Sequence, residues 1–198
     1  MTNEPQLILA SSSPHRARAL SVLGIGFATQ APAVTESRAE GETAQQLSLR
    51  LGLAKAQSVQ DKHPQAIVIG SDQVGLCEDQ FLGKPGSVAR AQRQLEFLSG
   101  KTAEFFTSIA IVGQARAPWT HCTLTSVKFR AYDASVAAAY VSVDEPMDCA
   151  GSFKSEGLGI ALFEWVRSDD PTALVGLPMI ALTSALQHFG INPIARHR

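Results

Sequence analysis

The 198-residue sequence has no long apolar run and no excess of charge of either sign. No stretch approaches the roughly 18 apolar residues of a membrane-spanning helix, so we expect no membrane partner. Seventeen Lys and Arg residues against eighteen Asp and Glu residues give a net charge of -1, which argues against charge-driven binding to nucleic acid. An anionic ligand must therefore be held by a few local groups.

Cysteine is scarce as well. Cys77, Cys122 and Cys149 are an odd number without a C-x-x-C pair, so the sequence suggests neither a disulfide framework nor a zinc ribbon. The N-terminal residues lack the basic segment of a secretory signal peptide. We therefore expect a soluble, cytoplasmic protein in a reducing compartment.

What the sequence does contain is an ordinary globular composition, with 45% apolar and 18% charged residues. The length favours one domain, 1–198, over two independent ones. Strand-like and helix-like apolar patterns alternate along the chain, which predicts an α/β fold with a mixed, twisted sheet and flanking helices. Extended segments or strands are expected at 7–10, 27–34, 66–69, 74–82, 105–112, 123–129 and 160–166, and helices at 15–23, from 43, 88–98, 133–143 and 178–189.

Several of these boundaries have local signals. Thr43 and Gln46 form a T-x-x-Q capping box, and Gly100 stands where a helix C-terminal glycine is expected. Glu78-Asp79 is the expected hairpin turn within 74–82. Pro178 is expected at the first position of the last helix.

The segment Ser11-Ser-Ser-Pro-His-Arg16 follows an expected strand and opens an expected helix. Ligands of open α/β sheets bind at such strand ends, beside helix N-termini that attract anions. The hydroxyls and free backbone N–H groups here suit phosphate oxygens, and Arg16 offers a planar donor fork. The alternative is an ordinary Ser/Pro helix start with a surface arginine.

Two acids are candidates for the chemistry. Asp72 follows the expected strand 66–69, on a turn that Gly70 is expected to open. A carboxylate there binds a divalent cation or takes a proton from water, although an Asp in a turn also occurs for capping alone. Glu36 lies in a polar loop, where nothing local distinguishes it from a solvated acid.

Two lysines stand out by position. On the expected second helix, Lys55 lies about 40° round from Leu51, so a cation borders an apolar stripe. A snorkelling lysine is the simple explanation. Lys84 lies in Gly83-Lys-Pro85, which suits either a phosphate-binding lysine or a turn. Acids, hydroxyls and separate cations together are what phosphoryl transfer requires.

These residues resemble the Maf nucleotide pyrophosphatases, which hydrolyse nucleoside triphosphates to monophosphates and pyrophosphate. The resemblance is ordered and covers nearly the whole chain. Its blocks are Ser11-x-Ser13-Pro14-x-Arg16, Glu36, Lys55, Gly70-Ser-Asp72, Gly83-Lys-Pro85, Ala150-Gly151 and Leu174-Val-Gly-Leu-Pro178. It implies a Maf/ITPase-like fold with two lobes around a central nucleotide-binding cleft.

Within that family, Gly70-Ser-Asp-Gln73 and Ala150-Gly-Ser-Phe-Lys-Ser-Glu156-Gly resemble the branch that acts on 7-methyl-GTP. Methylation at N7 makes the guanine ring positive, and its Watson–Crick edge offers two N–H donors. A carboxylate such as Glu156 complements both features, whereas the Gln typical of the UTP and dTTP branch suits a neutral base.

The resemblance also implies a role for each matched position. Asp72 is expected to activate water for attack on the α-phosphorus, and Glu36 and Asp72 to hold a divalent cation such as Mg²⁺, Mn²⁺ or Co²⁺. The expected triphosphate-binding and charge-neutralising residues are Ser11, Ser13, Arg16, Lys55 and Lys84. The specificity positions are His15, Gln73 and Glu156, with His15 standing where Arg or Trp is usual.

The leading hypothesis is therefore a house-cleaning pyrophosphatase for 7-methyl-GTP, with a nucleoside triphosphate as its partner. Three alternatives remain open: a pyrophosphatase for an unmodified nucleotide such as dTTP or UTP, a non-catalytic nucleotide-binding regulator of cell division, and a structural module that binds no nucleotide. Family members are often dimers, so the resemblance also allows a homodimer.

Overall fold

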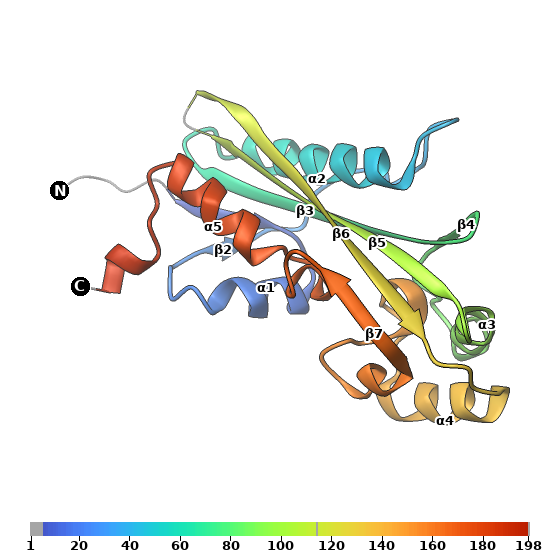
Figure 1. Ribbon diagram of the computed structural model, residues 1–198. Helices are drawn as coiled ribbons and strands as arrows, with labels where there is room; N and C mark the ends of the chain where they lie inside the picture. The colour runs from blue at the N-terminus through green and yellow to red at the C-terminus, as the bar shows by residue number, and fades with distance from the viewer. Residues whose placement is uncertain (1–5, 114, 198) are drawn as a thin grey trace. The chain divides into compact units, whose positions relative to one another are not determined.

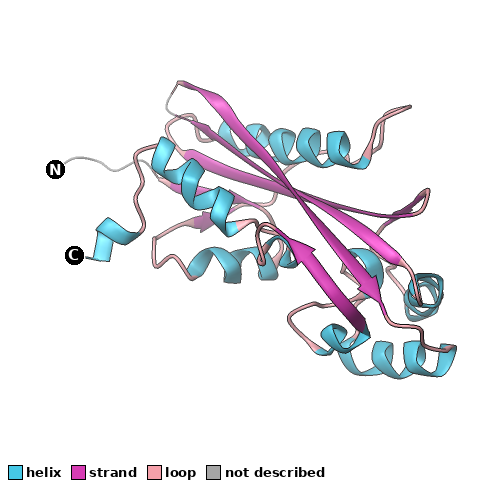
Figure 2. Ribbon diagram, viewed as in Figure 1, coloured by secondary structure: helices cyan, strands magenta, loops and turns pink. Residues whose placement is uncertain are grey.

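The computed structural model describes residues 6–113 and 115–197. Its elements alternate between strands and helices around a mixed sheet (Figures 1 and 2). The strands are β1 Leu7–Ala10, β2 Ala28–Thr29, β3 Ile67–Cys77, β4 Gln80–Leu82, β5 Thr102–Gly113, β6 Arg116–Phe129 and β7 Phe163–Ser168. The α-helices are α1 Pro14–Ser21, α2 Ala44–Gln60, α3 Val88–Leu98, α4 Ala134–Asp144 and α5 Met179–His188. Among the described residues, none of the helices has the length and apolarity of a membrane span.

The strands pair in the order β2-β1-β3-β5-β6-β7, and β4 pairs with β3. β1 runs parallel to β2 and β3, whereas β4 is antiparallel to β3 and β7 is antiparallel to β6. Parallel and antiparallel pairs thus share one sheet, with helices beside it. The expected mixed α/β fold class is confirmed.

The chain divides into two compact units. The first unit has three segments: the described residues up to Asp72, then Thr107–Thr123, and then the described residues from Asp170 onward. The second unit has two segments, Gln73–Phe106 and Leu124–Asp169. The long strands β3, β5 and β6 contribute residues to both units. The expectation of a single domain with a cleft between two lobes stays a prediction.

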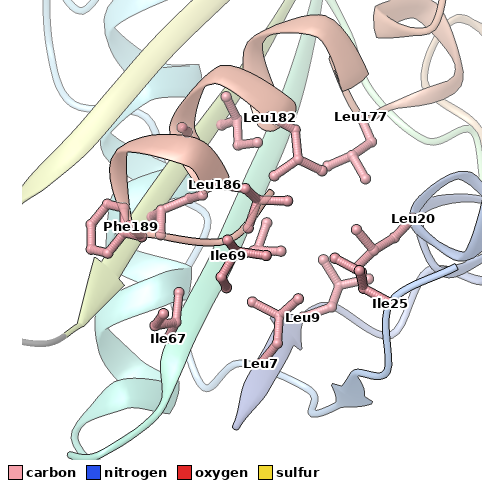
Figure 3. Close-up of a cluster of buried hydrophobic side chains, with 14 of the residues drawn as sticks. Leu7, Leu9, Leu20, Ile25, Ile67, Ile69, Leu177, Leu182, Leu186 and Phe189 are labelled. Atoms are coloured by element: carbon pink, nitrogen blue, oxygen red, sulfur yellow. The ribbon is translucent and has the colours of Figure 1, made fainter. Parts of the chain in front are cut away.

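In the first unit, one face of the sheet packs against α1 and α5. Side chains alternate between the faces of a strand, so every second residue of β1, β3 and β5 points the same way. Figure 3 shows Leu7, Leu9, Ile67 and Ile69 beside the α5 residues of this cluster. The buried cluster also contains Leu20, Ile25, Ile109, Ile111, Leu177, Leu182, Leu186 and Phe189.

The opposite face of the same strands packs against α2. The alternate residues Ile8, Ala10, Val68, Ala110 and Val112 form a second buried cluster with Ala56 and Val59 of α2. Both faces are therefore covered, which explains why β1 and the start of β3 are apolar without alternation.

Strand alternation carries on past the apolar part of β3. Val68 faces α2, so Gly70 and Asp72 face α2 as well. The predicted turn at Gly70–Gln73 is wrong, because β3 continues without interruption to Cys77. Gly70 instead lets the α2 backbone approach: a Cβ on it would lie 2.2 Å from the Gly52 carbonyl oxygen and 2.7 Å from the Ala56 nitrogen.

The second unit has an aromatic core. The rings of Phe105, Phe129, Phe153 and Phe163 make four edge-to-face contacts, with centroids between 5.0 and 5.7 Å apart. Edge-to-face packing matches the positive ring edge to the negative ring face. The short 3-10 helix Ala150–Ser152 packs on α3, which also contacts α4.

The predicted helix bounds hold to within two residues, whereas the expected extended segment 27–34 contains only the two-residue strand β2, and β6 begins seven residues before its predicted start at 123. The Thr43/Gln46 capping box is confirmed, and so is the hairpin turn at Glu78–Asp79. The predicted strand 160–166 is wrong at its start, because Leu158–Leu162 forms a 3-10 helix before β7. Pro178 is the N-cap residue of α5 instead of its first helical residue.

Replacing Gly70 with Ala should lower the free energy of unfolding by about 1–3 kcal/mol, the usual cost of overpacking. The added methyl group meets backbone atoms of α2, which cannot rotate away as a side chain can. Urea denaturation followed by circular dichroism measures the change.

Gly26→Ala is the matched control, because Gly26 is exposed and a Cβ on it would have no neighbour within 4 Å. Its unfolding free energy should stay within about 0.5 kcal/mol of the wild-type value. Equal stability of Gly70→Ala and Gly26→Ala would contradict the close approach of α2 and β3.

Candidate active site

The centre of the candidate site is the ammonium group of Lys55, which contacts two carboxylates. Its Nζ lies 2.5 Å from Asp72 Oδ1 and 2.6 Å from Glu36 Oε1. The side chains of Lys55 and Asp72 are 8% and 7% exposed, whereas that of Glu36 is 57% exposed. Two buried, oppositely charged groups thus meet a third that is open to solvent.

The helix and the strand place these groups together. Lys55 and Ala56 follow each other on α2, and Ala56 packs into the buried cluster against β1 and β3. Asp72 lies two residues beyond Gly70, on the face of β3 that α2 covers. The snorkelling explanation for Lys55 is therefore wrong, because its ammonium group turns inward to an acid.

Burial governs the protonation of Asp72. It raises the pKa of this carboxyl group, because a low-polarity environment disfavours the ionised form. Attraction and a hydrogen bond from Lys55, and attraction from Arg16, oppose the increase, while the negative charge of Glu36 adds to it. The pKa remains above the ordinary value of an aspartate, which brings the carboxylate closer to the range of a general base at neutral pH.

Arg16 joins this group from the other face of the sheet. Burial lowers the pKa of its guanidinium, and the charges of Asp72 and Glu36 act in the opposite direction. Its Nε donates to the carbonyl oxygen of Gly176 at 2.8 Å, and the Ser71 hydroxyl donates to the same oxygen at 2.9 Å. Gly176 has a φ of +105°, a conformation that other residues rarely adopt.

Ser11 and Ser13 are engaged with the start of α1. The Ser13 hydroxyl caps the helix by accepting from the Arg16 N–H at 3.4 Å, and the Ser11 hydroxyl accepts from the Ser13 N–H at 3.1 Å. The expectation of free backbone N–H groups in this segment is wrong for the N–H groups of Ser13 and Arg16. His15, the second residue of α1, is half-buried.

Three of the predicted site residues belong to the second unit. Gln73 is half-buried and follows Asp72 directly, and Lys84 is exposed next to the buried Pro85. Glu156 is exposed, and its Oε2 accepts from the Ser155 hydroxyl at 3.4 Å. The convergence of these three residues with the group around Lys55 stays a prediction.

Sequence reasoning missed the residues that hold this group in place. Ser48 and Ser108 contact the backbone of Asp72, while the Gly176 carbonyl orients Arg16. Ser48, Gly52 and Lys55 have the i, i+4, i+7 spacing of one helix face, which is a signal that the sequence does contain. The contacts of Ser108 and Gly176 connect distant segments and leave no local signal.

The arrangement suits an anionic, metal-assisted reaction. Carboxylate oxygens are the ligands that Mg²⁺ and Mn²⁺ prefer, and those of Glu36 and Asp72 already converge on one cationic group. The chemistry of this donor set therefore fits a divalent cation. Arg16 and Lys55 add two positive charges beside these carboxylates, and such groups pair well with anionic oxygens.

Comparison with known proteins places these residues in a wider context. A family described as "Maf-like protein" matches residues 6–189. The chain is 46% identical over 194 residues to a Bordetella avium protein named 7-methyl-GTP pyrophosphatase, and the alignment covers 98% of both chains. A Pseudomonas aeruginosa protein of the same name is 44% identical, covering 95% of this chain and 98% of that one. The solved structure of the Staphylococcus aureus Ham1 protein overlaps with a TM-score of 0.45 at 14% identity, covering 63% of this chain and 71% of that chain.

Because burial outweighs its neighbours, the Asp72 carboxyl group should titrate above the usual aspartate value of about 3.9. ¹³C NMR of the carboxyl carbons in EDTA measures this midpoint. Lys55→Met should raise it further, since the opposing charge and hydrogen bond are lost. Asp133 is the control: hydrogen bonds from Ser135 and Val136 lower its pKa, and its titration midpoint should be the same in Lys55→Met and wild type.

The same shift predicts how stability depends on pH. A folded-state pKa above the unfolded value stabilises the protein at low pH, and this contribution is lost as pH rises through the folded pKa. Asp72→Asn removes this contribution. The unfolding free energy of the variant relative to wild type should therefore increase as pH rises from the unfolded to the folded pKa of Asp72. A constant difference in urea unfolding free energy would contradict the raised pKa.

Proposed function

The chain belongs to the Maf family, and on this basis we propose that it hydrolyses 7-methyl-GTP to 7-methyl-GMP and diphosphate. The observation that carries the proposal is the buried Lys55 ammonium in contact with both Asp72 and Glu36, with Arg16 beside them. Perturbed carboxylates buried beside cationic side chains are concentrated at functional sites, which favours an enzyme over a structural module. Relatives at about 45% identity carry the name of this activity.

In the proposed reaction, Asp72 accepts a proton from the attacking water. The water oxygen forms a bond to the α-phosphorus, the bond from the α-phosphorus to the bridging oxygen breaks, and diphosphate leaves. The shift in the Asp72 pKa makes its carboxylate a stronger base than an exposed aspartate. Lys55 holds the carboxylate through a 2.5 Å contact before the reaction begins.

The cationic side chains offset charge on the triphosphate. Arg16 is held through its Nε by the Gly176 carbonyl, which leaves the terminal nitrogens of its guanidinium for phosphate oxygens. Lys55 and Lys84 are the other proposed triphosphate-binding residues, with Ser11 and Ser13 at the start of α1. Preorganised cations of this kind stabilise charge that develops in the transition state.

Glu36 and Asp72 are the residues proposed to hold the divalent cation, Mg²⁺, Mn²⁺ or Co²⁺. When bound, such a cation neutralises phosphate charge and acts as a Lewis acid. Glu36 is well placed for exchange of the ion because its side chain is 57% exposed. Asp72, by contrast, is 7% exposed, so the two acids differ in their access to solvent.

Glu156, Gln73 and His15 are the proposed specificity residues. A carboxylate complements the positive charge of the methylated ring and the two N–H donors of guanine. The loop that carries Glu156 is fastened to α4: the Lys154 N–H donates to the Tyr140 hydroxyl at 2.9 Å, and the Lys154 ammonium donates to the Asp144 carbonyl at 2.5 Å. An anchored loop presents the carboxylate with little loss of entropy on binding.

A panel of nucleoside triphosphates with Mg²⁺ or Mn²⁺, with diphosphate release as readout, tests the proposal. The largest kcat/KM should belong to 7-methyl-GTP. A larger kcat/KM for UTP or dTTP would make that nucleotide the substrate in place of 7-methyl-GTP, and no release from any nucleotide would overturn the proposal.

Cytoplasmic location and a homodimer stay predictions from the sequence.

Asp72→Asn should lower kcat by about 10²- to 10⁴-fold, the usual contribution of a general base. The dissociation constant of a non-hydrolysable nucleotide analogue, measured by calorimetry, should change by only a few-fold. Asp61→Asn is the matched control, because Asp61 is an exposed residue at the end of α2 and should keep wild-type activity. Full turnover by Asp72→Asn would assign the proton transfer to another group.

Glu156→Gln should reduce the preference for 7-methyl-GTP over UTP by about tenfold or more, the value of one charged hydrogen bond. The ratio of the two kcat/KM values measures this preference. Glu164→Gln, an exposed change on β7 of the same unit, should leave the ratio as it is. An unchanged ratio in Glu156→Gln would remove Glu156 from base recognition.

A further inference from the structure

We propose that a buried hydroxyl pair, Ser48 and Ser108, positions the general base Asp72, and that Gly52 is required to admit Ser108. The inference rests on the proposed function of Asp72. Both serines bond to the backbone of Asp72, from which the carboxylate projects, so both act as positioning residues.

The hydroxyl pair binds both polar groups of the Asp72 backbone. The Ser48 hydroxyl donates to the Asp72 carbonyl oxygen at 3.1 Å, and the Asp72 N–H donates to the Ser108 hydroxyl at 3.3 Å. The Ser108 hydroxyl in turn donates to the Ser48 carbonyl at 2.6 Å. This closed set of contacts joins α2, β3 and β5 at one residue.

Burial makes these contacts strong constraints. Ser48 and Ser108 are 0% and 1% exposed, so water cannot replace a lost partner. A buried donor or acceptor without a partner costs more than the bond itself contributes. Loss of either hydroxyl should therefore free the Asp72 backbone, which the Ser108 hydroxyl also approaches through the Asp72 carbonyl oxygen at 3.4 Å.

Helix and strand periodicity explain why the two serines meet at Asp72. Ser48 and Lys55 are seven residues apart on α2, which is two turns along one face. Ser108 shares the α2-facing side of β5 with Ala110, as Asp72 shares the α2-facing side of β3 with Gly70. The same helix face thus contacts the Asp72 backbone through Ser48 and the Asp72 carboxylate through Lys55.

Gly52 is the residue that makes room for this arrangement. A Cβ at position 52 would lie 2.4 Å from Ser108 Oγ, 3.4 Å from Ser108 Cβ and 3.5 Å from the Asp72 nitrogen. The first distance is far inside van der Waals contact, while the others are close to ordinary packing. A glycine inside a helix is unfavourable, so its presence here needs a packing reason, and the Ser108 hydroxyl is that reason.

A neighbouring cysteine completes the environment of the hydroxyl pair. Burial raises the pKa of Cys122 to about 11, and a hydrogen bond with Ser48 acts in the opposite direction. The thiol therefore stays neutral at physiological pH.

Loss of the hydroxyl pair should reduce the rate and spare substrate affinity. The proposed triphosphate-binding side chain Arg16 is held by the Gly176 carbonyl, whereas the two serines bond to each other and to the Asp72 backbone. A displaced base lowers kcat, and a shift of about 1 Å costs up to about a hundredfold. KM should remain within about twofold of the wild-type value, because the contacts that bind substrate and transition state equally are unchanged.

The test compares Ser108→Ala and Ser48→Ala with wild type in diphosphate release from 7-methyl-GTP and in amide hydrogen exchange. We expect kcat to fall by about tenfold to a hundredfold at nearly constant KM. The Asp72 amide in Ser108→Ala should lose at least about tenfold more protection than the amide of Ile69, because only the former loses its acceptor. Ser58→Ala is the control, since the Ser58 hydroxyl donates to the carbonyl of Lys55 within α2.

A double variant separates positioning from general damage. Gly52→Ala alone should lower kcat and the melting temperature, because its methyl group displaces the Ser108 hydroxyl. Gly52→Ala/Ser108→Ala should have the kcat of Ser108→Ala, and a melting temperature at or above it, since Ala is the better helix residue. Additive losses in the double variant would overturn the pairing of Gly52 with Ser108.

Two further outcomes decide the proposal. Wild-type kcat and unchanged Asp72 exchange in Ser108→Ala would overturn it, as would a loss confined to KM. If wild type releases diphosphate from no nucleotide, the proposed function fails. The hydrogen exchange of Asp72 then still shows whether the hydroxyl pair holds this backbone, because that measurement needs no substrate.

Discussion

The contact between a buried ammonium group and a buried carboxylate, Lys55 and Asp72, is the interaction on which the rest of the candidate site depends. Neither charge is stable in the interior alone, because each gives up its hydration. The partly exposed Glu36 and the guanidinium of Arg16 complete the balance of charge around them. The site is thus a small electrostatic unit in which each member stabilises the ionised form of another.

Close packing of one helix on one strand makes that unit possible. Gly70 on β3 and Gly52 on α2 lack the side chains that would separate the two backbones. Their absence brings the α2 face with Ser48 and Lys55 within hydrogen-bond distance of Asp72. Both glycines have ordinary negative φ, so they allow close packing of the two backbones and form no turn. The predicted turn at Gly70 was wrong for this reason.

Elements with a local period were predictable, and contacts between distant segments were not. The Thr43/Gln46 capping box, the Glu78–Asp79 hairpin and most strands follow from residues close in sequence. Lys55 was visible as a cation beside an apolar stripe, but its inward orientation depends on Asp72, 17 positions away. The role of Gly176 depends on Arg16, 160 positions away. The segment before β7 has an apolar pattern that suits a strand, but it forms a 3-10 helix. Family resemblance supplied the selection of acids and cations, and the structure supplied their partners.

The Gly176 carbonyl has a consequence for the order in which the protein is built. It accepts hydrogen bonds from Arg16 and Ser71, segments that leave the ribosome long before it does. Because such long-range contacts form late, the nascent chain carries an unsupported guanidinium until almost all of its residues have been synthesised. A prematurely terminated chain that stops short of this carbonyl therefore lacks the acceptor that orients Arg16.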